Sequence, residues 1–374
     1  MTSIKRSPFI AATIAIVTAL VLTACSTPEQ SGGGEEADEN AKVPSSVELV
    51  VPFAVGGGTD VWARFIAPYM QKAVKGEPKI TIKNVEGGEG ITGANEFVRD
   101  AGTDGSKLLV GSGSTYIPAL LKRKEVQYDM SKLIPITVNA TGGAVYVSPK
   151  TGLKSAEDLE GYGKELEYGG ISATGNDLVT LLAMDVLDID IDATFGFEGR
   201  GPARLALERG EIDMDYQTTS AYLTQVVPMV EDKKAVPLFS FGVLKDGKIV
   251  RDPALPDLPT VEEVYEQKNG SKPSGPKYDA YRAFLAAGYF YQKGLFANEG
   301  TPDSIVKEYR DSLTTIGKDK EFLSKSDEAL GGYPLVSGEN VQADLKKAFT
   351  ITDAVRQYTL DLLADEYDVE IETK

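Results

Sequence analysis

The chain has 374 residues, of which 42% are apolar and 25% are charged, a composition typical of a globular protein long enough for two domains. Its 39 basic and 56 acidic residues give a formal net charge of −17, so no basic surplus exists to bind the phosphates of a nucleic acid. Histidine is absent and cysteine occurs once, which excludes serine–histidine triads, cysteine–histidine pairs, histidine-ligated zinc and intramolecular disulfides. We therefore expect no catalytic residues, no metal and no cofactor.

The N-terminus has the pattern of an export signal. Lys5 and Arg6 precede an apolar run from Phe9 to Leu22, which is too short to span a bilayer comfortably and ends in Leu22-Thr23-Ala24-Cys25. This stretch resembles a bacterial lipoprotein signal, and a plain secretory signal is the alternative. The resemblance implies removal of residues 1–24 and lipidation of Cys25.

Residues 25–45 are rich in Gly, Glu and Ser and almost free of large apolar side chains, so they cannot bury enough surface to order themselves. We expect a lipidated cysteine followed by a flexible acidic tether. An anchor and a tether together predict a folded domain held at the outer face of the cytoplasmic membrane.

From residue 47 onward, strand and helix patterns alternate. The first half predicts strands and helices in turn at 47–53, 61–74, 79–84, 94–101 and 107–111. Thr59 or Asp60 is the expected N-cap of the first helix, and Pro68 interrupts its pattern.

The alternation restarts further along the chain. Strands are predicted at 166–170, 193–197 and 212–216, with a helix from Leu178 to Val186 and another between Pro202 at its first position and Gly210 at its end. Loops are expected at 251–259 and 268–278, and helices at 303–313 and 341–363. This rhythm favours an α/β fold with mixed sheets flanked by helices.

Three loops share one design, in which a strand is followed by Gly with Ser or Thr and then by a helix. They lie at 54–60, 112–116 and 170–177. Glycine allows close approach of a ligand to the backbone, and the free N–H groups of a helix's first turn bind carboxylate or phosphate without a cationic side chain. The alternative is that these glycines only allow helices to pack on strands.

Other motifs give weaker signals. Residues 88–93 match the GxGxxG pattern, but the next strand ends without the acidic residue that a dinucleotide site requires. Residues 188–192 resemble the start of a calcium loop, but Ala193 stands where glycine is needed. Asp213 and Asp215 share a face of one strand. Such a pair leaves open the alternative that the protein is a secreted hydrolase that uses two carboxylates.

The segment Val51-Pro52-Phe53-Ala54-Val55-Gly56-Gly57-Gly58-Thr59-Asp60 resembles the opening of the tripartite tricarboxylate transporter receptors, the Bug family. Further segments follow in the family's order, at 84–90, 104–112, 170–175, 197–213, 258–260 and 300–302. The resemblance covers about residues 47–363. Three residues depart from the pattern: Val55 replaces the usual Pro, Glu198 a common Lys, and Gln217 a frequent Asp.

The resemblance implies a two-lobed fold of the type II periplasmic-binding-protein class, with the ligand in the cleft between lobes. It implies a first lobe at 46–146 and 271–374, the latter with C-terminal helices, and a second lobe at 147–270. The loops at 54–60 and 170–177 would face each other across the cleft.

The resemblance also implies partners. The protein would be a monomeric receptor that delivers a small organic acid to a membrane permease with one large and one small subunit, and that contacts the membrane through its lipid anchor. A receptor of the same fold for another solute or transporter is the alternative. The candidate ligand-binding residues are Phe53, Val55, Gly56, Gly57, Gly58, Thr59, Asp60, Ser112, Ser114, Thr115, Gly170, Ser172, Thr174, Gly175, Asn176, Arg200 and Asp213.

Overall fold

The computed structural model describes residues 41–374. The expectations for residues 1–24 and for lipidation of Cys25 lie outside the described residues. Within 41–374, no helix combines the length and the apolar character needed to cross a membrane.

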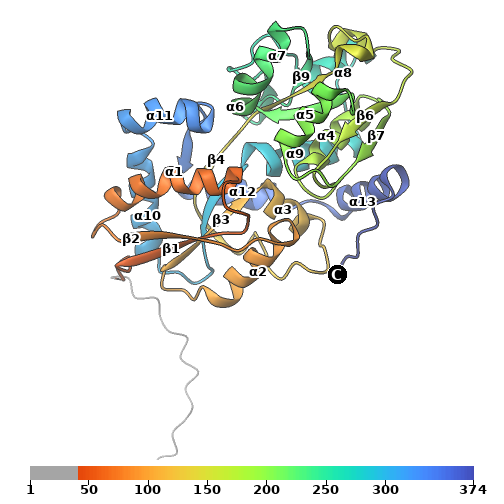
Figure 1. Ribbon diagram of the computed structural model, residues 1–374. Helices are drawn as coiled ribbons and strands as arrows, with labels where there is room; N and C mark the ends of the chain where they lie inside the picture. The colour runs from red at the N-terminus through yellow and green to blue at the C-terminus, as the bar shows by residue number, and fades with distance from the viewer. Residues whose placement is uncertain (1–40) are drawn as a thin grey trace, which may run out of the picture. The chain divides into compact units, whose positions relative to one another are not determined.

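The first of two main sheets has six strands in the order β13-β4-β12-β3-β1-β2. Figure 1 labels four of these strands, β1, β2, β3 and β4. β1 pairs in parallel with β2 and β3, whereas β12 runs antiparallel to β3 and β4. The carboxyl ends of β1, β2, β3 and β4 therefore share one edge with the start of β12. The bounds are β1 (Ser46–Val51), β2 (Lys79–Asn84), β3 (Lys107–Ser112), β4 (Ile134–Asn139), β12 (Lys293–Ala297) and β13 (Leu335–Ser337).

Helices cover both faces of this sheet. α1 (Gly58–Ala73) places Trp62 and Ile66 in one apolar cluster with Leu49 of β1. α2 (Ile91–Asp100) and α3 (Gly113–Leu120) belong to a different cluster, which contains Leu109 of β3. Because alternate strand residues point to opposite faces, the chain leaves β1 towards one face and β3 towards the other.

The second sheet has five strands in the order β7-β6-β8-β5-β9. β6 runs parallel to β7 and β8, and β5 is antiparallel to its neighbours. The bounds are β5 (Gly143–Val147), β6 (Leu166–Gly169), β7 (Ile191–Thr194), β8 (Met214–Thr218), β9 (Val236–Ser240), and a separate hairpin of β10 (Val243–Lys245) and β11 (Lys248–Val250).

The remaining helices surround the second sheet or follow the last strands. They are α4 (Asp177–Val186), α5 (Arg200–Arg209), α6 (Thr219–Ala221), α7 (Val227–Glu231), α8 (Val261–Asn269), α9 (Pro276–Leu285), α10 (Asp303–Ile316), α11 (Lys320–Leu330), α12 (Glu339–Ala348) and α13 (Asp353–Tyr367). Single turns lie at η1 (Gly88–Gly90), η2 (Pro149–Thr151), η3 (Ala156–Leu159), η4 (Tyr222–Val226) and η5 (Ala286–Phe290).

Several element ends differ from the sequence-based expectations. The N-cap of α1 is Gly57, so Thr59 and Asp60 lie inside its first turn, and Pro68 lies within the helix. α5 begins at Arg200, which makes Pro202 its third residue. The helix expected over 341–363 is two helices, because Thr352 caps α13 by accepting a hydrogen bond from the Val355 amide at 3.2 Å.

The chain passes between the sheets at positions other than those expected. β5 belongs to the second sheet, so the first passage lies at 140–142, and the return lies just before β12. The Gly- and Pro-rich stretch at 268–278 instead joins α8 to α9, with Gly270 in the left-handed conformation at the end of α8. Composition did not reveal the first passage because β4 and β5 are both apolar runs separated by three residues.

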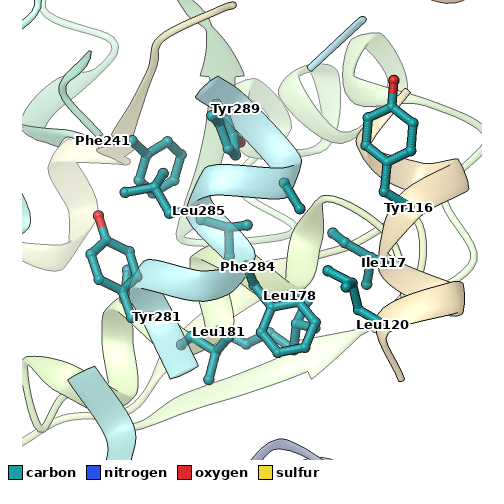
Figure 2. Packing of buried hydrophobic residues seen from close by; sticks show 14 of the residues in the cluster. Tyr116, Ile117, Leu120, Leu178, Leu181, Phe241, Tyr281, Phe284, Leu285 and Tyr289 are labelled. Atoms are coloured by element: carbon teal, nitrogen blue, oxygen red, sulfur yellow. The ribbon is translucent and has the colours of Figure 1, made fainter. Parts of the chain in front are cut away.

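The two sheets share one apolar core. Tyr116, Ile117 and Leu120 of α3 and Leu178 of α4 belong to the same buried cluster as Phe284 of α9 (Figure 2). α3 follows a strand of the first sheet, and α4 follows a strand of the second. The described residues accordingly pack as one compact unit.

Candidate functional site

The first glycine loop joins β1 to α1 and is held by Asp60. The Asp60 carboxylate is 1% exposed and accepts hydrogen bonds from the Gly56 amide at 2.8 Å, Arg64 Nε at 2.8 Å and Asn84 Nδ2 at 3.0 Å. The hydrogen bond from Arg64 is the main cause that lowers the pKa of Asp60 to about 2. Asp60 is therefore ionised and holds its own loop in place through these hydrogen bonds. The Gly56 N–H donates to Asp60 and is not free to bind a ligand.

The tip of this loop is open. Val55 is 71% exposed, and a Cβ added at Gly56 or Gly58 would have no neighbour within 4 Å. The amides of the first residues of α1 have no acceptor inside the helix, so they remain available to an anion. The Phe53 ring packs against Gly90 instead of lying at the tip: a Cβ added at Gly90 would lie 2.8 Å from the ring.

Lys293 stands beside this loop, and sequence reasoning did not identify it. It is the first residue of β12, in register with Ser112 of β3 and Asn139 of β4. Its Nζ donates a hydrogen bond to Thr59 Oγ1 at 2.9 Å, and burial lowers the pKa of Lys293 to about 7. No sequence signal links Lys293 to a loop 234 residues earlier, since the pairing exists only in the folded sheet.

Trp62 lies on the same side of the sheet. It is 3% exposed, and its indole Nε1 donates to Asn139 Oδ1 at 3.2 Å. Asn139 in turn donates to the Tyr333 carbonyl at 2.9 Å. The only tryptophan of the chain is thus hydrogen-bonded to Asn139, the residue of β4 that pairs with Lys293 of β12. We therefore expect the fluorescence of Trp62 to respond to a ligand bound at the first loop.

The second glycine loop, between β6 and α4, is braced in the same way. Asp177 is 2% exposed and accepts hydrogen bonds from the amides of Ile171 at 3.3 Å and Ser172 at 3.2 Å, and from the Tyr168 hydroxyl. Ile171 itself is 39% exposed at the tip. As in the first loop, part of the backbone donor set is bound to an internal carboxylate.

A second carboxylate, that of Glu89, lies among the hydroxyl groups of this loop. Glu89 belongs to η1 and has a backbone φ of 58°, a conformation that residues other than glycine rarely adopt. Its carboxylate accepts hydrogen bonds from Ser172 Oγ at 2.7 Å, from Thr174 Oγ1 and from Arg123 Nη1 at 3.2 Å. Arg123 also donates to Thr174 Oγ1 at 2.9 Å. This group, here called the Glu89 cluster, joins a turn of the first sheet to a loop of the second.

The loop at 112–116 meets the second glycine loop directly. A Cβ at Gly113 would lie 2.2 Å from Asn176 Oδ1 and 2.8 Å from the Gly288 Cα. A Cβ at Gly175 would lie 3.5 Å from Ser114 Oγ. Asn176 Oδ1 is buried and has no hydrogen-bond partner among the described residues. Thr115 Oγ1 accepts from the Ser112 amide at 3.2 Å and so supports the turn at the end of β3.

Arg200 points inward. Its guanidinium pairs with Asp215 at 2.8 Å, donates to the Gly169 carbonyl at 2.7 Å and stacks over the Tyr216 ring at 4.7 Å. Burial raises the pKa of Asp215 to about 6. Gln217 donates to Asp215 Oδ2 at 3.1 Å. Arg200 therefore holds the end of β6, where the second glycine loop begins.

Asp213 lies elsewhere. It precedes β8 and pairs through its backbone with Ser148, at the edge of the sheet opposite to the Gly170 turn. Asp215 is 0% exposed and bound to Arg200, so the two carboxylates do not form an open pair. Glu198 is exposed at the surface.

A cavity of about 420 Å³ adjoins the Glu89 cluster. Its wall includes Glu89, Arg123, Glu125, Ile171, Ser172, Ala173, Thr174, Phe195 and residues 369–372. Over residues 41–374, no three side chains of Cys, Asp or Glu are grouped as a metal site would require.

Comparisons with known proteins give relatives over most of the chain, although no family model matches. A UPF0065 protein of Bordetella pertussis is 27% identical over 288 residues, which cover 74% of this chain and 78% of that protein. The protein BugT of the same organism is 25% identical over 270 residues, which cover 70% of this chain and 72% of BugT.

Solved structures show the same fold. The periplasmic binding protein BugD matches with a TM-score of 0.60 at 19% identity, covering 87% of this chain and 99% of BugD. A TctC solute-binding protein from Polaromonas matches with a TM-score of 0.62 at 18% identity, over 84% and 98% of the two chains. MatC from Rhodopseudomonas palustris with bound malate matches with a TM-score of 0.57 at 23% identity, over 84% and 97%.

Proposed function

We propose that this chain, whose relatives include UPF0065 and Bug proteins, is an extracytoplasmic receptor of the Bug family that captures a small organic acid and delivers it to a tripartite tricarboxylate transporter permease. One observation carries the proposal: in each sheet a parallel strand ends in a glycine loop that opens a helix and is braced by an aspartate in the helix's first turn. Ligands of open α/β sheets bind outside the carboxyl ends of such strands.

The ligand class follows from the donor groups at the two loops. The first turn of α1 offers amides at an open tip, and the second loop offers the hydroxyl groups of Ser172 and Thr174 beside Arg123. Amides, hydroxyl groups and a guanidinium suit a carboxylate. The exposed Val55 and Ile171 at the two tips suit the carbon chain between carboxyl groups.

The proposed capture requires donors from both sheets. A ligand shifts a two-state equilibrium only by its difference in affinity for the two states, and donors on opposed loops engage together only in the closed state. The Glu89 cluster already links η1 to the second glycine loop, so a ligand carboxylate would compete with the Glu89 carboxylate for Ser172 and Thr174.

The proposal places the protein at the outer face of the cytoplasmic membrane, anchored by lipidated Cys25 and the tether at 25–45, as a monomer that meets a permease of one large and one small subunit. The relatives support an extracytoplasmic site, since BugD is a periplasmic binding protein. Loss of membrane association on Cys25→Ala, in cells labelled with a palmitate analogue, would support the anchor, whereas a membrane-bound, unlabelled variant would contradict it.

The binding proposal is tested by titrating the purified domain with malate, succinate, adipate and citrate. We expect stoichiometric binding of at least one acid without turnover, read by calorimetry and by Trp62 fluorescence, together with a rise in Tm. The fully amidated, neutral analogues of the same acids serve as controls. A flat response and an unchanged Tm across all four acids would reject the carboxylate class and favour another solute.

A further inference from the structure

Among residues 41–374, Lys293 has no acidic partner. Its side chain is half-buried, and its only hydrogen bond within residues 41–374 is to Thr59 Oγ1. None of the ion pairs found in that part of the chain includes Lys293. An ammonium removed from water is unfavourable unless it is paired, and a protein with a net charge of −17 has no shortage of carboxylates that could have paired with it.

The nearby acid does not compensate this charge. Asp60, on the helix that provides Thr59, is satisfied by Arg64, Asn84 and the Gly56 amide. The neighbours of Lys293 on β3 and β4 are the uncharged Ser112 and Asn139. Burial is the cause of the lowered pKa of Lys293, and no charged group within residues 41–374 contributes to that shift.

The position of Lys293 is that of a binding site in this architecture. It starts β12 at the sheet edge where β1 and β3 end. The chain leaves β1 for α1 on one face and β3 for α3 on the other, and the crevice between two such diverging loops is where open α/β sheets bind ligands. Lys293 also follows the passage at which the chain returns from the second sheet to the first.

We propose that Lys293 binds one carboxylate of the ligand, in concert with the first-turn amides of α1. This inference rests on the proposed function and assigns it a side-chain cation at the first glycine loop. The free acid supplies the missing counter-charge, whereas an amide of the same shape cannot. Lys293 thus selects for ionised carboxylates over neutral analogues.

The test compares Lys293→Met with wild type, using the best-binding acid of the four-acid panel and its fully amidated, neutral analogue. We expect the variant to lose roughly tenfold to a hundredfold in affinity for the acid, the range of one hydrogen bond to a charged group, and to bring the ratio of its affinities for the acid and the neutral analogue towards one. Lys107→Met is the matched control, because Lys107 is a half-buried lysine at the opposite end of the neighbouring strand β3. We expect Lys107→Met to leave the affinity and the ratio unchanged.

Lys293→Gln provides the second variant should methionine disturb packing, and the unfolding midpoint of each variant establishes that it is folded. Equal affinity of wild type and both folded Lys293 variants for the acid would overturn the inference while leaving the receptor function intact. An equal loss for the acid and its neutral analogue would also overturn it, because a purely structural lysine would act on both. Failure of wild type to bind any acid would instead overturn the proposed function and this inference together.

Discussion

The two glycine loops are built alike and used differently. Each follows a parallel strand, opens a helix and gives backbone N–H groups to an aspartate in the helix's first turn, Asp60 in one and Asp177 in the other. The first keeps an open tip beside the cationic Lys293, whereas the second already holds the carboxylate of Glu89. The local design is therefore generic, and residues distant in the sequence decide what each loop faces.

The largest change in stability is expected where the loops at 112–116 and 170–177 contact each other. Gly113 begins α3 and Gly58 begins α1, but only Gly113 is crowded, by Asn176 and the Gly288 backbone. Gly113→Ala should lower the free energy of unfolding by about 3 kcal/mol through overpacking, whereas Gly58→Ala should change it by less than about 1 kcal/mol. Urea unfolding of both variants measures the difference. Equal stability would show that the loops at 112–116 and 170–177 do not pack as described.

The next largest effect on stability is expected from removing the Asp60 carboxylate, which holds the first glycine loop in place. Asp60→Asn should lower the free energy of unfolding by about 2 kcal/mol at neutral pH, because Arg64 loses its charged acceptor. The pKa of Asp60 is about 2 in the folded protein, below its ordinary value of 3.8. Its contribution is therefore full above that ordinary value and is lost as the pH falls towards 2.

Asp100→Asn is the control for Asp60→Asn, since it removes an ion pair whose two partners are both exposed. Its expected cost in stability is small, because solvent screens an exposed ion pair. Unfolding of both variants at pH 7 and pH 3 separates the two cases. An Asp60→Asn cost that does not shrink with acid would contradict the brace.

Glu89 offers a way to make the second loop resemble the first. Glu89→Gln removes the internal negative charge and one of the two acidic partners of Arg123, so the affinity for a dicarboxylate should rise roughly fivefold, the effect of about 1 kcal/mol. Glu125→Gln is matched, because Glu125 also pairs with Arg123 but makes no contact with Ser172 or Thr174. A rise in both variants would assign the effect to net charge alone.

The smallest expected effect is the pH dependence of ligand binding. The pKa of Lys293 is about 7 in the folded protein, and a bound carboxylate favours its charged form, so affinity should fall as the pH rises above 7. Binding at pH 8 should take up a fraction of a proton, measured by calorimetry in two buffers of different ionisation enthalpy. Lys293→Met should abolish the uptake. Uptake that survives in that variant would place the titrating group elsewhere.

Much of the architecture was predictable from local pattern. The strand at 79–84 and the end of α5 at Gly210 match the expectations, because alternation and a left-handed glycine are decided by neighbouring residues. The comparisons find UPF0065 and Bug proteins as relatives over most of the chain and confirm the α/β fold with two helix-flanked sheets. The ligand-binding role of the seventeen candidate residues remains a prediction. The structure places Arg200 in an internal ion pair and Asp213 at the far edge of its sheet.

The sequence by itself determined where the glycine loops lie and which helices they open, since strand period, glycine and helix start are local properties. Only the tertiary structure decided that Lys293 adjoins Thr59 and that Glu89 reaches Ser172. Those contacts join segments 234 and 83 residues apart. The sign of charge at each loop depends on strand order and chain crossing, which no local pattern records.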